Sequence, residues 1–428
     1  MKEKYIKRLL LIWCLILIYG TLLPFNFKIP TNFNIFNILS YISIPTRISK
    51  SDFVLNILIF VPFGFLFFAL NENKVGNYIR LILALLFITI IFSFLLELSQ
   101  IFLPTRTSSF SDIIAQIIGS ILGAILFIKF KSHIFNFLSS EININDKLRI
   151  SIYAYSLILL IYGLLPGDIS ISPVFVYYKW KRGLIKLIPF YHETIAVILH
   201  NFSSQFVLYV PLGLLVALYY KHSKDILLLR VIFISGGISL FIELMQLFTN
   251  YHVTDLGEVL ASILGACFGA YIYISKSKIV KKYISILLIS LFIIVYSLYP
   301  YKFSTNIVER FISMSFIPFS IYYNMPFFFA FESILHKFLF FNILGFYIAL
   351  CNQNFSLKKL YLLAISCSLI ISIILMIGQL FISIRIFDIS DIMIVILGVI
   401  SGVLIYRNFF VFIIQNMEFY HGMESSSI

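Results

Sequence analysis

Carboxylate, carboxamide and cationic side chains recur three times in this sequence at one spacing. Glu97 and Glu243 each stand three residues before a glutamine, which places acid and amide on one face of a helix. Three further residues follow each glutamine. A basic or imidazole side chain stands at position 6, a residue suited to helix capping at position 9, and an acid at position 12. The three copies are Glu97, Gln100, Arg106, Ser109 and Asp112; Glu243, Gln246, His252, Asp255 and Glu258; and Gln379, Arg385, Asp388 and Asp391, with Met376 where the glutamate would stand.

The two glutamates are the strongest candidates for chemistry. Glu97 lies among apolar residues near the end of a predicted helix, where desolvation and the helix dipole both disfavour a carboxylate. No helix-capping pattern accounts for it, so we expect a carboxyl group that is protonated or paired with a cation such as Arg106. An intramembrane carboxylate of this kind is a functional candidate, as a ligand-binding group or a general base.

The other positions of the pattern each have two interpretations. Arg106 and Arg385 could pair with acids of their own copies, or could bind a phosphate or carboxylate of a ligand bidentately. The acids at position 12 follow the capping residue by three, which is the spacing of a capping box, so they either cap helices or bind a ligand. Close helix packing explains the glycines that follow: Gly119 and Gly123, Gly265 and Gly269, Gly398 and Gly402.

A further polar residue lies on an earlier helix of each copy. Asn56 is followed by Pro62 and Gly64, and Gln205 is followed at the same intervals by Pro211 and Gly213. The third copy has Lys337 and Gly345 at the matching places, without the proline. We expect Asn56 and Gln205 to belong to the same ligand-binding sets as the acids.

Composition identifies the elements that must position these groups. The 428 residues are 61% hydrophobic and only 12% charged, whereas about a quarter of an average soluble chain is charged. The apolar runs are continuous and about 18 to 22 residues long, which is the length of a membrane-spanning helix. The sequence therefore predicts an all-α polytopic membrane protein with about 12 transmembrane helices.

These helices fall into three repeats of four, at residues 1–140, 141–277 and 278–428. Lys and Arg are more frequent in the N-terminal segment, the even-numbered loops and the tail than in the odd loops. By the positive-inside rule both termini face the cytoplasm, and the polar pattern faces outward. The net charge of +13 is explained by these basic loops, and no nucleic-acid partner is expected.

The first copy resembles the VanZ-like family of bacterial membrane proteins. The resemblance rests on Asn56, Phe60-Val-Pro62-Phe-Gly64, Glu97, Gln100, Phe102, Arg106, Asp112 and Gly119; the departure is Gln116, where the family usually shows Asn. The second copy matches with His252 in place of the arginine, and the third through fewer residues. The resemblance implies a place in the bacterial cytoplasmic membrane and a role in resistance to glycopeptide antibiotics of the teicoplanin type.

We therefore expect an outward-facing polar site, one per repeat or one shared, that binds or remodels an envelope glycolipid, a lipid-linked precursor or a lipoglycopeptide. Membrane lipids are the expected partners, and no cofactor or metal is expected. One alternative is a proton-coupled transporter, which requires polar groups that continue toward the inner face. The other is a membrane enzyme acting on lipid-linked substrates, with Glu97 or Glu243 as general base.

Overall fold

The structure is a computed structural model. It describes residues 3–23, 25–30, 41–43, 50–104, 106–138, 144–165, 170–191, 193–220, 226–250, 252–275, 277, 283–303, 308, 311, 317–323, 325, 327–382 and 388–407. The chain divides into two compact units, Met1–Ile142 and Asn143–Ile428.

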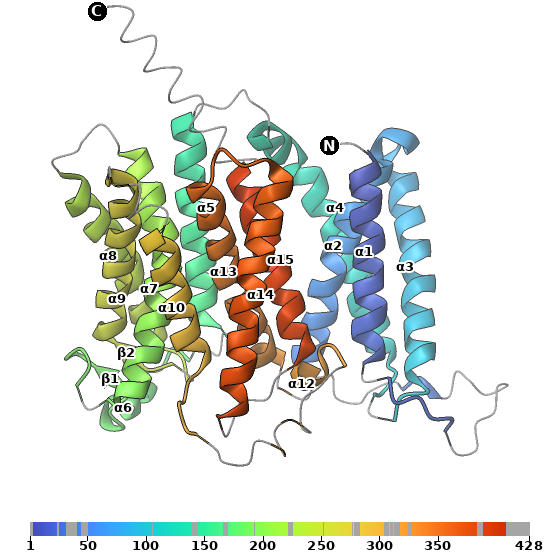
Figure 1. The fold of residues 1–428 in the computed structure, drawn as a ribbon. Helices are drawn as coiled ribbons and strands as arrows, with labels where there is room; N and C mark the ends of the chain where they lie inside the picture. The colour runs from blue at the N-terminus through green and yellow to red at the C-terminus, as the bar shows by residue number, and fades with distance from the viewer. Residues whose placement is uncertain are drawn as a thin grey trace, which may run out of the picture. The chain divides into compact units, whose positions relative to one another are not determined.

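The first unit contains one repeat of four long helices: α1 (Glu3–Leu22), α2 (Lys50–Val75), α3 (Tyr78–Gln100) and α4 (Phe110–Leu138). They run side by side, and α2 packs most extensively on α4 (Figure 1). Asn77 sets the start of α3, because its side chain accepts the backbone N–H groups of Ile79 and Arg80 at 2.9 and 3.4 Å. The buried side chains of this unit include Phe60, Phe68 and Leu85.

The second unit contains two repeats. The second repeat consists of α5 (Ile144–Leu164), α7 (Ile195–Tyr219), α8 (Leu227–Gln246) and α9 (Leu256–Ile274). The third consists of α10 (Ser285–Ser297), α13 (Phe327–Cys351), α14 (Leu357–Leu380) and α15 (Ile389–Ile405). Short elements lie between them: α6 (Pro173–Lys181), α12 (Ser320–Tyr323) and the parallel strands β1 (Ile185–Lys186) and β2 (Thr254–Asp255).

Helix α7 lies at the centre of the second unit. It lies beside α8, α9 and α10 (Figure 1), contacts α5 and α13 as well, and has 72% of its apolar span buried by protein. The first helix of the third repeat, α10, packs on both α7 and α13. The second and third repeats therefore share one continuous apolar core, which includes Leu208 and Tyr347.

Helices occupy all twelve predicted spans. Ten of them, among the residues described, are long and apolar enough to cross a bilayer. The other two are shorter apolar helices, α10 with 13 residues and α15 with 17. The prediction of an all-α polytopic membrane protein is confirmed.

The second and fourth helices of each repeat touch backbone to backbone. A Cβ atom on Gly64 of α2 would lie 1.9 Å from the Ser120 oxygen of α4, and one on Gly123 of α4 would lie 2.0 Å from the Val61 oxygen of α2. Gly213 with Gly269, and Gly345 with Gly402, repeat this contact in the other two repeats. The packing predicted from the glycine spacing is confirmed, and it fixes the fourth helix, which carries the acids, against the second.

Candidate functional site

The glutamates of the first two repeats hold the start of the fourth helix. Oε2 of Glu97 accepts the backbone N–H of Ser109 at 2.9 Å, and Oε2 of Glu243 accepts that of Asp255 at 2.8 Å. The two side chains are 1% and 2% exposed, so these bonds lie in a desolvated interior. The expectation that capping contacts do not account for the glutamates is wrong, because each carboxylate reaches across the loop to the residue that precedes the next helix.

The residues at position 9 cap the fourth helix, as the spacing predicts. Asp255 Oδ1 accepts the N–H of Gly257 at 2.7 Å, and Asp388 Oδ1 accepts that of Ser390 at 2.8 Å. Ser109 does the same through its hydroxyl, toward Ser111 N at 3.2 Å. Burial raises the pKa of Asp255 above its ordinary value.

In the second and third repeats, the acids at position 12 bind the second helix instead of closing a capping box. Glu258 Oε2 accepts a hydrogen bond from Gln205 Nε2 at 2.7 Å. Asp391 Oδ1 accepts one from Lys337 Nζ at 2.5 Å. The capping-box interpretation fails in the second repeat because Glu243 already binds the Asp255 N–H that such a box would use.

The matching group in the first repeat is an amide pair. Gln116 Nε2 donates to Asn56 Oδ1 at 3.4 Å, and Asp112 sits in the first turn of α4, with its N–H bonded to the Ser109 oxygen at 3.2 Å. Asn56, Gln205 and Lys337 each stand eight residues before the glycine that touches the fourth helix. One position of the second helix thus contacts the fourth helix in all three repeats.

The glutamines hold the end of the first helix. Gln100 Nε2 donates to the backbone oxygen of Thr21 at 3.3 Å, and Gln246 Nε2 donates to that of Gly163 at 2.7 Å. The carbonyls in the last turn of a helix have no partner within the helix, so a buried amide donor stabilises that end. Gln379 of the third repeat instead lines a cavity.

The residues at position 6 contact the same helix end. Arg106 Nη2 donates to the Gly20 oxygen at 3.3 Å, and His252 Nε2 lies 2.5 Å from the Leu165 oxygen. A cation at a helix C-terminus also complements the helix dipole. Arg385, the candidate of the third repeat, lies outside the described residues.

Several residues that contribute to these clusters carry no clear signal in the sequence. Lys179 of α6 is 2% exposed, and its Nζ donates to the backbone oxygens of Gln246 and Thr249 at 2.5 and 3.1 Å. Tyr322 of α12 donates to Asp391 Oδ1 at 2.6 Å, and burial followed by the charge of Asp391 raises the pKa of this tyrosine. Both lie in connecting segments, where apolar periodicity says nothing about tertiary contacts.

A cleft opens beside Arg106 in the first unit. It has a volume of about 500 Å³, within the range of roughly 300 to 1,000 Å³ that is usual for small-molecule sites. Its walls carry two cations, four hydroxyl groups and apolar side chains, which include Lys28, Arg106, Tyr41, Ser43, Thr107 and Ser108. Lys28 could not be found from the repeat pattern, because it belongs to the irregular segment after α1.

Backbone hydrogen bonds assemble this cleft from three segments. Lys28 N donates to the Phe102 oxygen at 2.7 Å, which ties the segment after α1 to the end of α3. Ser43 N and Oγ both donate to the Ser108 oxygen at 2.9 Å. These bonds therefore hold together the loops at the polar end of the first repeat, and the loops form the cleft.

Among the described residues, each of these hydrogen-bonded clusters joins side chains of a single repeat. The helices and clusters together define a polytopic membrane protein made of three tandem four-helix units. A family model described as VanZ/LLP1 matches residues 10–135, 152–280 and 283–413. The chain belongs to the VanZ/LLP1 family, as the motifs of the first repeat indicated. No curated protein and no solved structure matches it.

Proposed function

We propose that this protein acts at the outer face of a bacterial cytoplasmic membrane, where it binds or remodels an envelope lipid, a lipid-linked precursor or a lipoglycopeptide. The observation that carries the proposal is the cleft beside Arg106. The distribution of Lys and Arg along the chain supports an outward orientation for this end of the helices. The known role of VanZ-like proteins in glycopeptide resistance supports a ligand of the envelope.

The chemistry of the cleft suits a headgroup that is anionic and hydroxylated. Arg106 is half-buried and Lys28 is exposed, so one cation lies inside the cleft and one near solvent. A guanidinium binds phosphate or carboxylate bidentately, and an ammonium adds a mobile charge. Ile101, Leu103 and Pro104 supply an apolar wall against which an acyl or isoprenoid chain can pack.

The test compares cleft variants with a charge-matched control. Cells deleted for the gene are complemented with wild type, Lys28→Glu or Lys28→Ala/Arg106→Ala, and with the control Lys358→Ala/Lys359→Ala. Lys358 and Lys359 are exposed at the start of α14, far along the sequence from the cleft. We measure susceptibility to teicoplanin, susceptibility to a glycopeptide without an acyl chain, and envelope-lipid composition.

At equal protein levels in the membrane, both cleft variants should lose the wild-type phenotype and the control should keep it. Lys28→Glu separates loss of function from misfolding. Lys28 is exposed, so reversing its charge does not bury an ion. Wild-type susceptibility and wild-type lipid composition in both cleft variants would rule out the proposal.

A second candidate is proton-coupled transport, which a buried polar chain in the second repeat favours. Ser239 Oγ donates to Ser262 Oγ at 3.1 Å, Ser262 Oγ donates to Gln205 Oε1 at 3.4 Å, and Gln205 donates to Glu258. Hydroxyl groups also stand four and eight residues before each glutamate, at Ser93 and Thr89 and at Ser239 and Ser235. Polar groups therefore continue for about two helical turns beyond the glutamate.

Proteoliposomes with an interior pH dye test this alternative. With a candidate envelope-related substrate added on one side, a coupled transporter should dissipate an imposed pH gradient faster than Glu258→Gln, which keeps the hydrogen bond to Gln205 but cannot carry a proton. Equal rates for wild type and Glu258→Gln would exclude proton coupling through this chain.

A further inference from the structure

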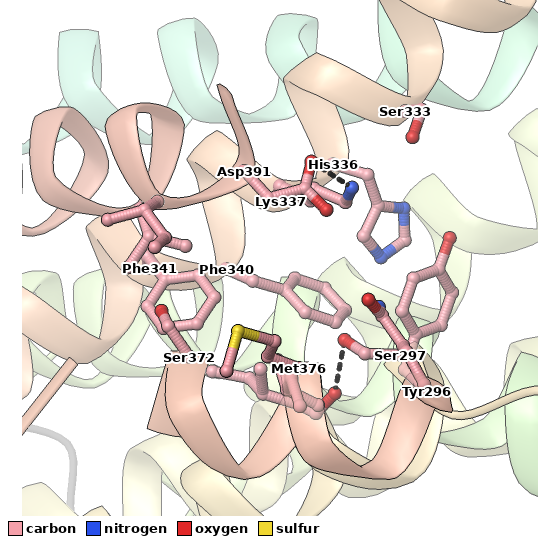
Figure 2. Close-up of a pocket in the computed structure, with 15 residues that line it drawn as sticks. Tyr296, Ser297, Ser333, His336, Lys337, Phe340, Phe341, Ser372, Met376 and Asp391 are labelled. Carbon is pink, nitrogen blue, oxygen red and sulfur yellow. Dashed lines mark hydrogen bonds and ion pairs between the residues drawn. The ribbon is translucent and has the colours of Figure 1, made fainter. Parts of the chain in front are cut away.

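The third repeat contains a small cavity between α10, α13, α14 and α15, close to where the other repeats hold their glutamates. Figure 2 shows the residues that line it, and its volume is about 50 Å³. A buried water needs roughly 10 to 15 Å³ of such space, so about three to five water-sized groups fit. Met376 stands at the glutamate position and lines this cavity. The third repeat therefore has space for a small ligand at the position that the glutamates occupy in the other two repeats.

The hydrogen-bonding groups on one side of the cavity are mostly acceptors. Gln379 is 7% exposed, and its Oε1 has no hydrogen-bond partner among the described residues. The hydroxyl of Ser297 donates to the Ile293 oxygen at 2.7 Å, and that of Ser372 donates to the Ser368 oxygen at 2.9 Å. Both hydroxyls have used their protons, so they offer lone pairs to a guest.

Lys337 and its counter-charge Asp391 lie on the opposite side, where the Ser333 hydroxyl and the His336 imidazole also line the cavity. Lys337 Nζ donates to Asp391 Oδ1 at 2.5 Å and to the Tyr322 hydroxyl at 2.7 Å, and Figure 2 shows Lys337 beside Asp391. An ammonium group has three N–H donors, so a third remains for a guest. Because the pair is neutral overall, an anionic guest would meet a carboxylate and several lone pairs and would be disfavoured.

Aromatic rings form the apolar walls. Tyr296, Phe340 and Phe341 line the cavity, and the Tyr296 ring stacks on His336 with centroids 3.9 Å apart. The Tyr296 ring also stacks on His200, with centroids 4.2 Å apart, so the two histidines hold this wall in place. C–H groups of a guest can pack against the rings of Phe340 and Phe341. A guest with both hydroxyl donors and C–H groups matches this lining better than water alone.

We propose that the third repeat binds the vicinal-diol end of a polyol, such as a glycerol group. Two carbons and two hydroxyls make four heavy atoms, which matches the volume. The hydroxyls donate to Gln379 Oε1 and to the serine lone pairs, and one of them accepts from Lys337. The proposal does not rest on the cleft of the first repeat, so each can fail without the other.

The experiment uses the full chain in phosphatidylcholine nanodiscs, with two arms that separate the sources of a diol. In the first arm, saturation-transfer NMR measures binding of free glycerol, with 1-propanol as the mono-ol control. In the second arm, native mass spectrometry measures retention of phosphatidylglycerol, phosphatidic acid and phosphatidylethanolamine added to the nanodiscs. The variants are Gln379→Leu and Met376→Glu, with Gln353→Leu and Met376→Leu as their matched controls.

We expect glycerol, phosphatidylglycerol or both to bind to wild type, and binding to fall at least fivefold in Gln379→Leu and in Met376→Glu. Gln353→Leu, in an exposed turn, and Met376→Leu should bind as wild type does. Glycerol binding assigns a free polyol, and binding of phosphatidylglycerol alone assigns a lipid headgroup.

Three results would overturn the proposal. The first is the absence of binding in both arms. The second is retention of phosphatidic acid or phosphatidylethanolamine as strong as that of phosphatidylglycerol, since neither has a diol. The third is unchanged binding in Met376→Glu, because this substitution places a charged side chain in the cavity. Met376→Glu also provides the test of the cavity if Gln379→Leu does not fold.

Discussion

Glu243 and Asp255 are joined by a 2.8 Å hydrogen bond from the Asp255 N–H to the Glu243 carboxylate, and Glu97 and Ser109 form the same bond at 2.9 Å. A carboxylate that approaches the end of one helix thereby fixes the start of the next. This contact gives a carboxyl group at membrane depth a structural role that does not require it to react.

The bond predicts a difference between two substitutions of Glu243. Glu243→Ala removes the acceptor and leaves a buried N–H unsatisfied, which should lower the free energy of unfolding by about 1 to 3 kcal/mol. Glu243→Gln keeps an oxygen acceptor and should retain most of the stability. Thermal unfolding in nanodiscs measures both, and a Gln variant as unstable as the Ala variant would contradict a hydrogen-bonding role.

The close approach of the second and fourth helices predicts which glycines tolerate a methyl group. Gly269→Ala places a Cβ 2.0 Å from the Val210 oxygen and should separate α7 from α9, with loss of monodisperse protein in size-exclusion chromatography. Gly237→Ala on α8 has no atom within 4 Å and should be neutral, or stabilising by about 0.5 to 1 kcal/mol. Equal behaviour of the two variants would refute this contact.

The pair of Lys337 and Asp391 should be replaceable as a unit. Lys337→Met alone leaves a largely buried carboxylate without its cation, which should cost on the order of 3 kcal/mol. The double variant Lys337→Gln/Asp391→Glu reproduces the Gln205 and Glu258 pair of the second repeat and should recover most of that loss. A double-mutant cycle of Lys337→Gln, Asp391→Glu and the double variant, from denaturation in detergent, measures the coupling, and additive effects would show that the pair does not interact.

Lys179 provides a prediction outside the repeat pattern. Its buried ammonium binds two carbonyls at the end of α8, so Lys179→Ala should destabilise the protein by about 1.5 to 3 kcal/mol. Lys181 is exposed on the same short helix, and Lys181→Ala should change the stability by less than about 0.5 kcal/mol. Thermal unfolding of the two variants measures both changes in stability. Equal destabilisation by the two substitutions would contradict a specific role for the buried Lys179 ammonium.

The sequence by itself determined the elements and their order. Continuous apolar runs specify membrane helices because lipid cannot satisfy an open backbone, and the recurring spacing specifies three repeats. The caps at Asp255 and Asp388 were also predictable, since capping depends on neighbours within one turn of the same helix. The packing of Gly123 was predictable because small residues spaced by four mark a helix face that another helix can approach closely.

Only the tertiary structure decided what the polar groups bind. The Glu97 partner lies 12 residues away across a loop, and the Gln100 partner lies 79 residues away on another helix, so helical periodicity could not connect them. The cleft beside Arg106 depends on bonds between loops, and the cavity beside Met376 depends on side chains from four helices. Their shapes arise from packing between segments distant in sequence, which the order of residues does not display.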